Sequence, residues 1–561
     1  MTTQENNLEL PDITIDWDQL IDYATKIEPD KSESSIECDL NSLTVEDKPI
    51  SQPWKGSGID DIYNNHGPFE YQEYPPIVQS DSHVVLFKLP INSKMEIEPN
   101  YSLHPPNNWH VDWVKMPHSP WSMYPFEEEE KMENCYRPRW EVINEALKKK
   151  IMSSAQLEAA IFSYNSKESD QWDFRALHYF FSETMKKEET EIFFENLLPK
   201  MIQLALQLPT LITGSIPVLK QQKNTTLSMS QLQIASLLAN AFFCTFPNYE
   251  IYPNINFYRL FRAFKDDKFQ RSLAVSEKLR CLIHYFGKVT SVAPQGTVTF
   301  QRRYIPLDDC PEWGKMTHQL PPLHITSKGT IESNAAGLLQ VDFANKKVGG
   351  GVLNWGCVQE EIRFVICPEL IVTRLFTEEL ENTEALVVTG IEQYSNYEGY
   401  GNFFKWNGDF IDETPRDSSG RRKTSVVAMD AYRFTKKNEQ YTIQKINREL
   451  NKAYVGFSSV ESNQDNLPAI ATGNWGCGAF RGDPKLKVLI QLMAAAVNKK
   501  SLVYFTFGDE ALQDSIAEMY SHLVQQNIRI GKLFTLLCQY ESISAKKRSN
   551  LYDFLKKQTL K

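Results

Sequence analysis

Short runs of β-branched and apolar residues alternate with segments of helical periodicity from about residue 286 onward, and this alternation limits the possible folds of the chain. It is typical of a three-layer α/β domain, in which helices cover both faces of a sheet. Ligands of such sheets bind where strands end in glycine-containing loops. The predicted strands are 297–300, 338–343, 386–389, 425–431, 469–471 and 502–507, and the predicted helices are 368–381, 438–454, 484–499 and 510–525.

The preceding part of the chain has a helical pattern. Between residues 139 and 285 apolar side chains recur at helical spacing, as in the stretch 194–204. A strand is predicted at 83–89, and residues 228–231 offer an N-cap for a helix that follows them. We therefore expect three parts after residue 80: a mainly helical accessory domain over 81–285, the α/β domain over 286–540 and a basic tail over 541–561.

Residues 1–80 are rich in Asp, Glu, Ser, Asn and Pro and predict a disordered acidic leader. The segment 13–24 is either solvated chain or a short amphipathic helix for a partner. The triplet 546–548, Lys-Lys-Arg, is either a solvated helix face or part of a nuclear import signal. We expect the protein in nucleus and cytoplasm.

Composition excludes several classes of function. The 561 residues carry a net charge of −11, which argues against nucleic-acid binding through general basicity. The nine cysteines include no Cys-x-x-Cys pair and indicate reduced thiols without structural zinc. Motifs of metalloproteases and serine hydrolases are absent, as are a secretion signal and an apolar run long enough for a membrane span. We expect no metal, no cofactor, no membrane and a monomer.

A glycine run followed by two acids occupies residues 349–361, which read Gly-Gly-Gly-Val-Leu-Asn-Trp-Gly-Cys-Val-Gln-Glu-Glu. Three successive glycines cost conformational entropy, which favours a positive φ or a close approach of the backbone to a ligand. Taken alone, Glu360 and Glu361 have two interpretations. They are a solvated helix start that complements the helix dipole, or they include a proton donor.

A second glycine-rich segment, 473–483, follows a predicted strand and precedes a predicted helix. Such a turn can present several backbone N–H groups to a diphosphate. It lacks the Gly-Lys-Ser/Thr ending of a P-loop, and Arg481 stands where a dinucleotide fingerprint has its third glycine. From its own residues, it is equally a phosphate-binding loop or a tight structural turn.

Together these motifs resemble the catalytic domain of poly(ADP-ribose) glycohydrolase. The resemblance rests on Val-Asp-Phe-Ala-Asn at 341–345, the triple glycine separated by seven residues from Gln-Glu-Glu, and Thr-Gly-Asn-Trp-Gly-Cys-Gly-Ala-Phe at 472–480. Further blocks at 229–247, 392–400 and 504–509 follow the same order. The resemblance implies a macrodomain-like three-layer α/β/α sandwich with a mixed sheet and an N-terminal helical accessory domain. It also implies hydrolysis of the ribose–ribose bonds of poly(ADP-ribose), mainly from chain ends, in the DNA damage response.

The resemblance assigns roles to individual residues. Glu361 would be the catalytic acid/base, and Glu360 would hold the adjacent ribose. Asp342 and Asn345 would support that site. The other residues expected to contact substrate are Ile331, Glu332 and Gln359 at the adenine end; Gly349, Gly350 and Gly351 in the first loop; Asn474, Gly478, Ala479, Phe480, Arg481 and Gly482 in the diphosphate loop; and Tyr400 and Phe507, with Phe480, as aromatic contacts.

Glycoside hydrolysis explains these residue types. The departing oxygen needs a proton, and the sugar passes through an oxocarbenium-like state. Adjacent residues cannot easily flank a sugar from opposite faces, so we expect one working acid/base, Glu361, whose pKa is raised by partial burial beside Glu360. The substrate's own diphosphate would help to stabilise the cation. For Phe507 the apolar run 502–507 leaves simple packing in a core strand as an equal alternative.

One departure from the family pattern concerns Arg481, where the family usually has glycine. Its side chain either restricts a positive φ or places a guanidinium on the phosphates.

Two further functions stay open: a non-catalytic macrodomain that reads ADP-ribose, and a hydrolase of mono-ADP-ribosylated proteins. The retained pair of glutamates favours the glycohydrolase that acts on poly(ADP-ribose) attached to proteins.

Overall fold

The computed structural model describes residues 56–62, 73–91, 97–101, 108–128, 131–247, 255–263, 269–459, 468–544 and 550–560. For 126–128, 131–135, 269–272 and 543–544 only the backbone is described. Most of the expected acidic leader, the candidate helix at 13–24 and the basic triplet at 546–548 lie outside these residues.

A mixed nine-stranded sheet forms the centre of the molecule, with strand order β1-β4-β5-β8-β11-β7-β12-β13-β6. Its last five strands, from β11 to β6, are mutually parallel, whereas β5 and β8 run antiparallel to their neighbours. Two hairpins, β2-β3 and β9-β10, stand apart from it. The strands are β1 His83–Val85, β2 Met123–Glu128, β3 Lys131–Pro138, β4 Thr225–Ser230, β5 Thr297–Tyr304, β6 Leu323–Thr326, β7 Leu339–Asp342, β8 Glu384–Thr389, β9 Ser395–Glu398, β10 Lys405–Asp409, β11 Ser425–Ala428, β12 Ile470–Gly473 and β13 Leu502–Phe505.

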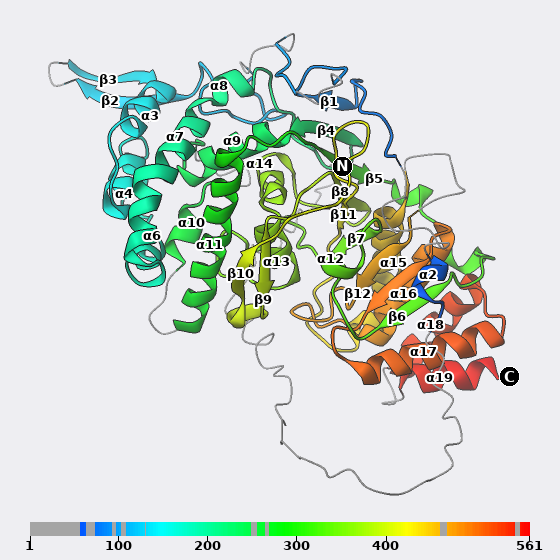
Figure 1. The fold of residues 1–561 in the computed structure, drawn as a ribbon. Helices are drawn as coiled ribbons and strands as arrows, with labels where there is room; N and C mark the ends of the chain where they lie inside the picture. Colours follow the sequence, from blue (N-terminus) through cyan, green and yellow to red (C-terminus); the bar gives the residue numbers. More distant parts are fainter. Residues whose placement is uncertain are drawn as a thin grey trace, which may run out of the picture.

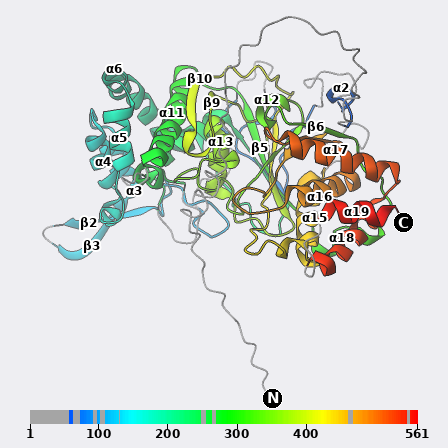
Figure 2. The ribbon, with the colours of Figure 1, turned by 90° about the horizontal axis from the view of Figure 1, so that it is seen from below.

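Helices gather at the two ends of the molecule, with those of residues 139–291 at one end and α15 to α19 at the other (Figures 1 and 2). No described helix is both long and apolar enough to cross a membrane. The α-helices are α2 Ile59–Ile62, α3 Arg139–Leu147, α4 Ser154–Phe162, α5 Arg175–Tyr179, α6 Lys187–Ile192, α7 Leu198–Leu206, α8 Leu208–Leu211, α9 Gln231–Phe242, α10 Tyr258–Arg262, α11 Phe269–Ser291, α12 Ile331–Asn334, α13 Gln359–Ile366, α14 Thr373–Phe376, α15 Ile443–Phe457, α16 Pro484–Val497, α17 Glu510–Gln525, α18 Ile530–Ser544 and α19 Leu551–Thr559. Short 3₁₀ or π turns are η2 Ser166–Glu168, η3 Phe180–Thr184, η4 Phe193–Leu197, η6 Leu307–Asp309, η7 Trp313–Lys315, η8 Pro368–Val372, η9 Gly401–Phe403 and η10 Glu439–Tyr441.

Two apolar cores lie on opposite faces of the sheet. Along β8, Leu386 and Val388 pack into the core shared with the helices before residue 291, and Ala385 and Val387 pack into the core beneath α15 to α19. This alternation follows from the two-residue period of a strand. The sheet is therefore the middle layer of a three-layer α/β/α fold, as predicted.

The predicted elements match the structure closely in the C-terminal half. The predicted helix 510–525 coincides with α17, and each of the six predicted strands overlaps an observed strand. The sheet also takes β1 and β4 from the stretch expected to be mainly helical, so it spans the expected boundary near residue 285, which stays a prediction. Residues 541–561, expected as a basic tail, include the end of α18 and α19, which buries four side chains.

The prediction of one helix over 368–381 is wrong. The structure has η8 and α14 there, and the helical chain ends at Phe376. Thr377 is extended because the chain turns to pair with Leu219: the Leu219 N–H donates to Phe376 O at 2.6 Å, and the Glu378 N–H donates to Leu219 O at 3.2 Å. Tertiary pairing thus replaces the last turns of the predicted helix.

A fully buried ion pair stabilises this junction. Arg302 on β5 contacts Glu384 at the start of β8, and its Nη1 also donates to the carbonyls of Leu219 and Glu378 at 2.9 and 2.8 Å. The Gln222 backbone N–H donates to the same carboxylate at 2.5 Å. The pair therefore connects β5 and β8 to the segment that leads into β4.

We expect Arg302→Met to lower the free energy of unfolding by about 3–5 kcal/mol, because it leaves the Glu384 charge buried and unpaired. Chemical denaturation measures this change. Adding Glu384→Gln should recover part of the loss. As a surface control, Lys405→Met removes the exposed pair with Glu398 and should cost less than about 1 kcal/mol. Equal losses for Arg302→Met and Lys405→Met would contradict the interpretation.

Candidate active site

The carboxyl ends of the parallel strands bring the predicted site residues to one edge of the sheet. α12 with Ile331 and Glu332 follows β6, and the loop that leads into α13 follows β7. The second glycine-rich loop follows β12, and Phe507 follows β13. Because β6, β7, β12 and β13 are mutually parallel, these four segments share that edge.

Backbone N–H groups hold both glutamates at the start of α13. Glu360 accepts hydrogen bonds from the N–H groups of Asn345 and Gly349, at 2.9 and 2.6 Å. Glu361 accepts from Gly351 and Val358, at 2.8 and 2.9 Å. Each side chain is only 3% exposed. The solvated helix start, which the sequence alone left open, is therefore wrong: both acids are buried against the loop.

Glycine is required where the loop passes the acids. Gly350 has a φ of +45°, and a Cβ there would lie 2.5 Å from a carboxylate oxygen of each glutamate. A Cβ at Gly356 would lie 2.7 Å from Glu361 Oε1. These distances are far below van der Waals contact. The run of glycines thus serves close approach of the backbone to buried carboxylates, and at Gly349 and Gly350 it also allows the positive φ.

A third buried acid, Asp342 at the end of β7, lies near the pair. Among the described residues neither of its carboxylate oxygens has a hydrogen-bond partner. Burial and the nearby charge of Glu361 raise the pKa of Asp342 well above its usual value, with Arg363 opposing them. Burial and the charges of Asp342 and Glu361 likewise raise the pKa of Glu360. Burial and mutual repulsion thus favour the protonated forms of the Asp342 and Glu360 carboxyls.

Two cations contact the opposite side of the glycine loop, and no sequence motif marks either of them. Arg374 of α14 donates to Gly350 O at 3.0 Å. Lys278 of α11 is fully buried and donates to carbonyls of the loop, among them Gly356 O at 2.7 Å. Burial lowers the pKa of Lys278 to about 8. Both come from elements distant in sequence, so no local pattern marks them.

The residues expected at the adenine end behave differently from one another. Gln359 uses its amide within the fold, accepting from Phe343 N at 2.8 Å and donating to Val341 O at 3.1 Å. Ile331 is buried. Glu332 accepts a hydrogen bond from the Tyr397 hydroxyl.

Asn345 and Tyr400 lie beside the glutamates. The Asn345 side chain accepts from Lys347 N at 3.0 Å, in addition to the backbone hydrogen bond with Glu360. Tyr400 is 52% exposed, and its hydroxyl accepts from Gln359 N at 3.3 Å. Tyr400 thus contacts the first residue of α13 through its hydroxyl, and its place at the rim of a ligand site stays a prediction.

The second loop is anchored by Trp475, which is fully buried and donates to Met429 O at 2.9 Å. The Lys487 ammonium lies 4.0 Å from the centre of its ring. Gly476 has a φ of +73°, and a Cβ there would lie 2.3 Å from Ala431 Cβ. Gly478 in contrast is exposed and has open space on its Cβ side. The loop thus has a packed base and an open tip.

The tip of the second loop carries Arg481, which is exposed and adopts a φ of +61°. The chain therefore takes the left-handed conformation despite the side chain. Phe480 and Ala479 are partly exposed. Gly482 is buried, and a Cβ added to it would lie only 2.8 Å from Gly476 O. Asn474 accepts from the Tyr504 hydroxyl at 3.0 Å. The loop geometry is thus compatible with either of its two sequence interpretations.

Phe507 lies outside β13, which ends at Phe505. It has a φ of +53°, is 41% exposed, and its ring centre is 6.3 Å from that of Phe343 at a steep angle. The alternative of a ring packed in a core strand therefore does not hold. Phe507 stands at the same sheet edge as the glutamates and offers a face to a planar group.

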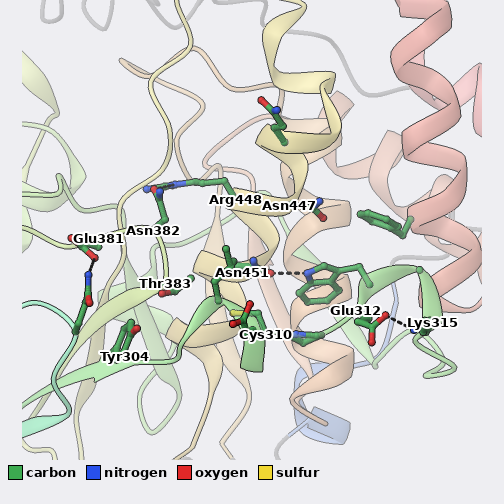
Figure 3. Close-up of a pocket in the computed structure, with 18 residues that line it drawn as sticks. Tyr304, Cys310, Glu312, Lys315, Glu381, Asn382, Thr383, Asn447, Arg448 and Asn451 are labelled. Atoms are coloured by element: carbon green, nitrogen blue, oxygen red, sulfur yellow. Dashed lines mark hydrogen bonds and ion pairs between the residues drawn. The ribbon is translucent and has the colours of Figure 1, made fainter. Parts of the chain in front are cut away.

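A separate cavity of about 1180 Å³ lies between α15, the 307–315 segment and the start of β8 (Figure 3). Its lining includes the side chains of Trp313, Asn447, Arg448 and Asn451, with a hydrogen bond of 2.7 Å from Trp313 to Asn451. None of the predicted site residues lines it.

Over the described part of the chain, no group of three or more His, Cys, Asp or Glu side chains could hold a metal.

The raised pKa of Asp342 predicts a pH-dependent stability. A carboxyl whose pKa is higher in the folded protein destabilises the fold as pH rises above about 4, since the unfolded chain ionises first. Asp342→Asn should therefore raise the free energy of unfolding at pH 8, and the gain should shrink towards pH 4. Chemical denaturation across this range measures it.

Asp430→Asn is the matched control. Burial opposes ionisation of Asp430, but Lys452 and Arg448 hold its pKa below the usual value. Removing that charge should destabilise the protein at pH 8. A pH-independent loss of stability in Asp342→Asn would show that the Asp342 carboxyl is not under strain.

Comparison with known proteins adds to this geometry. The family model described as "Poly (ADP-ribose) glycohydrolase (PARG), Macro domain fold" matches residues 310–514, and the one described as its helical domain matches 185–302. The chain is 31% identical to probable poly(ADP-ribose) glycohydrolase 2 of Arabidopsis thaliana over 457 residues, which cover 70% of this chain and 86% of the relative. It is 36% identical to poly(ADP-ribose) glycohydrolase 2 of Caenorhabditis elegans over 329 residues, 55% of this chain and 64% of the relative.

Proposed function

Because this chain belongs to the poly(ADP-ribose) glycohydrolase family and is a glycosidase that hydrolyses poly(ADP-ribose), we propose that Glu361 is its general acid and base. The observation that carries this proposal is the buried pair at the start of α13, held by the loop amides at the carboxyl edge of the sheet. A protein that only binds ADP-ribose has no need to bury two acids there at the cost of their hydration.

In the proposed reaction Glu361 protonates the ribose oxygen that leaves, and the C–O bond to the anomeric carbon breaks through an oxocarbenium-like state. The carboxylate then takes a proton from the water that attacks the same carbon, which restores the acid. Glu360 holds a hydroxyl of the adjacent ribose. One acid/base suffices, because the two acids are consecutive residues and contact the same glycine, Gly350.

The N–H groups at Gly351 and Val358 fix the position of the acid before substrate arrives. A carboxylate held by two donors cannot rotate freely, so its proton is directed towards one point. Asp342 lies near the pair with no donor of its own among the described residues, and burial raises its pKa well above the usual value. We propose that it supports the site without contacting the anomeric carbon.

Binding of the terminal ADP-ribose unit is proposed to use the loop after β12. Its open tip at Gly478 and Ala479 leaves backbone N–H groups accessible for a diphosphate, and Arg481 adds a positive charge. The exposed rings of Tyr400 and Phe507 suit the adenine and ribose. If the terminal ADP-ribose unit must bind in this loop before Glu361 can reach the ribose–ribose bond, cleavage occurs mainly at chain ends.

Two other functions are distinguished by the substrate. A reader of ADP-ribose would bind the polymer without releasing product, and a hydrolase of mono-ADP-ribosylated proteins would release ADP-ribose from a protein side chain. The experiment incubates the purified protein with length-defined poly(ADP-ribose) and, in parallel, with mono-ADP-ribosylated protein. Free ADP-ribose as the main early product from the polymer supports cleavage from chain ends, whereas early oligomers contradict it.

Glu361→Gln should lower kcat on poly(ADP-ribose) by about 10²- to 10⁴-fold, because the amide cannot transfer the proton. Steady-state release of ADP-ribose measures it. Glu369→Gln is the matched control: burial raises the pKa of Glu369 to about 8, its carboxylate accepts from Gln231, Tyr394 and the Glu392 backbone N–H, and kcat should stay near wild type. Unchanged kcat in Glu361→Gln would exclude the proposed role.

Arg481→Gly tests the diphosphate loop. If the guanidinium contacts the phosphates, the variant should bind ADP-ribose about tenfold more weakly, the equivalent of about 1.4 kcal/mol, and with less dependence on salt. Removing a left-handed non-glycine residue should at the same time stabilise the fold. Calorimetric titration with ADP-ribose at two salt concentrations measures the first effect. Tighter binding by the variant would show that the side chain hinders the ligand.

A further inference from the structure

We propose that Lys278 is a positioning residue: its ammonium occupies an internal cation cradle formed by backbone carbonyls, and this holds the glycine loop in the shape that presents N–H groups to Glu361. The inference rests on the proposed role of Glu361. It assigns to the N-terminal helical part of the chain a direct share in building the active site.

The cradle consists of four carbonyl oxygens on one side of the loop. Lys278 Nζ lies 2.5 Å from Asn354 O, 2.7 Å from Gly356 O, 3.0 Å from Val352 O and 3.5 Å from Gly351 O. An ammonium has three N–H donors, so the four carbonyls share them. The lysine is fully buried. Such an arrangement compensates for the lost hydration of the charge by a ring of carbonyl dipoles.

The same turn contacts the catalytic acid on its other side. Gly351 directs its N–H to Glu361 and its C=O towards Lys278. The loop can close this tightly because it has no side chains where it folds back: a Cβ at Gly351 would lie 3.0 Å from the Cα of Gly356. Gly351 O also accepts from the Asn354 N–H at 2.9 Å, but without the ammonium the carbonyls of Val352, Asn354 and Gly356 would lose their donor, and the turn would open to find others.

The lysine reaches the loop from α11, which packs beside α13 (Figure 1). The neighbouring Glu277 accepts a hydrogen bond from the backbone N–H of Trp406 at 3.0 Å. Consecutive residues of α11 therefore contact the glycine loop and the β9-β10 hairpin. A side chain tethered to a long helix fixes the cradle more rigidly than a mobile ion would. This connection explains how a helical part outside the sheet can determine the geometry of the acid.

The deciding experiment removes the Lys278 side chain and supplies a free alkylammonium ion from solution. Lys278→Ala should lower kcat on poly(ADP-ribose) by about ten- to a hundredfold with a small change in KM, because a misplaced catalytic group costs rate more than binding. Propylammonium chloride, which replaces the lost atoms, should restore part of kcat. Lys278→Met fills the space with an apolar chain and should not be restored.

A second readout does not depend on activity. The melting temperature of Lys278→Ala should rise with propylammonium and not with tetramethylammonium, which has no N–H donor. Lys452→Ala is the control for loss of a buried lysine: Lys452 contacts Asp430 and the carbonyls of Glu381 and Glu384, away from the glycine loop. It should lose stability but keep kcat.

The outcomes separate the two proposals. A wild-type protein without activity on the polymer would remove the proposed function, while melting of Lys278→Ala with and without propylammonium would still test the cradle. Unchanged kcat in folded Lys278→Ala, or an equal kcat loss in Lys452→Ala, would overturn the positioning role. Should Lys278→Ala not fold, Lys278→Gln takes its place, and an unchanged kcat there would equally overturn it.

Discussion

Two consecutive carboxylates are buried at the proposed active site, and backbone N–H groups must reach both of them. Glu360 and Glu361 each accept two such hydrogen bonds. Burying a carboxyl without donors costs several kcal/mol, so the loop must pass within hydrogen-bond distance. That distance leaves no room for a Cβ at Gly350, which explains why glycine stands there.

Turning N–H groups towards the acids turns carbonyl groups away from them, and these carbonyls also need partners. Lys278 and Arg374 supply the donors on that side. The site is therefore layered, with acids, then a single thickness of backbone, then cations. The backbone N–H groups pair with the acids and the backbone carbonyls pair with the cations, so the conformation of the loop at Glu361 depends on groups on both of its sides.

The second loop shows a different balance between rigidity and access. Its base is fixed by the buried Trp475 and by Gly476, whereas its tip at Gly478 is open. At this tip Arg481 adopts the left-handed backbone conformation. That conformation costs a residue with a side chain about 1–2 kcal/mol. A strained residue at a candidate binding loop fits the general tendency of functional sites to hold such conformations.

Much of this could be predicted from the sequence because it is local. Alternating patterns fixed the class of fold, and α17 could be placed to the residue; the glycine run and the spacing to Glu361 marked the loop. The helix predicted over 368–381 failed because pairing with Leu219, distant in sequence, outcompeted local propensity. Burial of Glu360 and Glu361 could not be read from the chain, since an acidic pair at a helix start is equally suited to water.

Local patterns along the chain thus specified the kind of backbone in each loop and the acids next to it. Which groups surround those acids was set by packing between distant segments. Lys278 lies 83 positions before Glu361 in an ordinary helical pattern, and only the packing of α11 against the loop brings its ammonium to the carbonyls. The physical reason is that hydrogen bonding and burial act through space, whereas periodicity and turn propensity act along the chain.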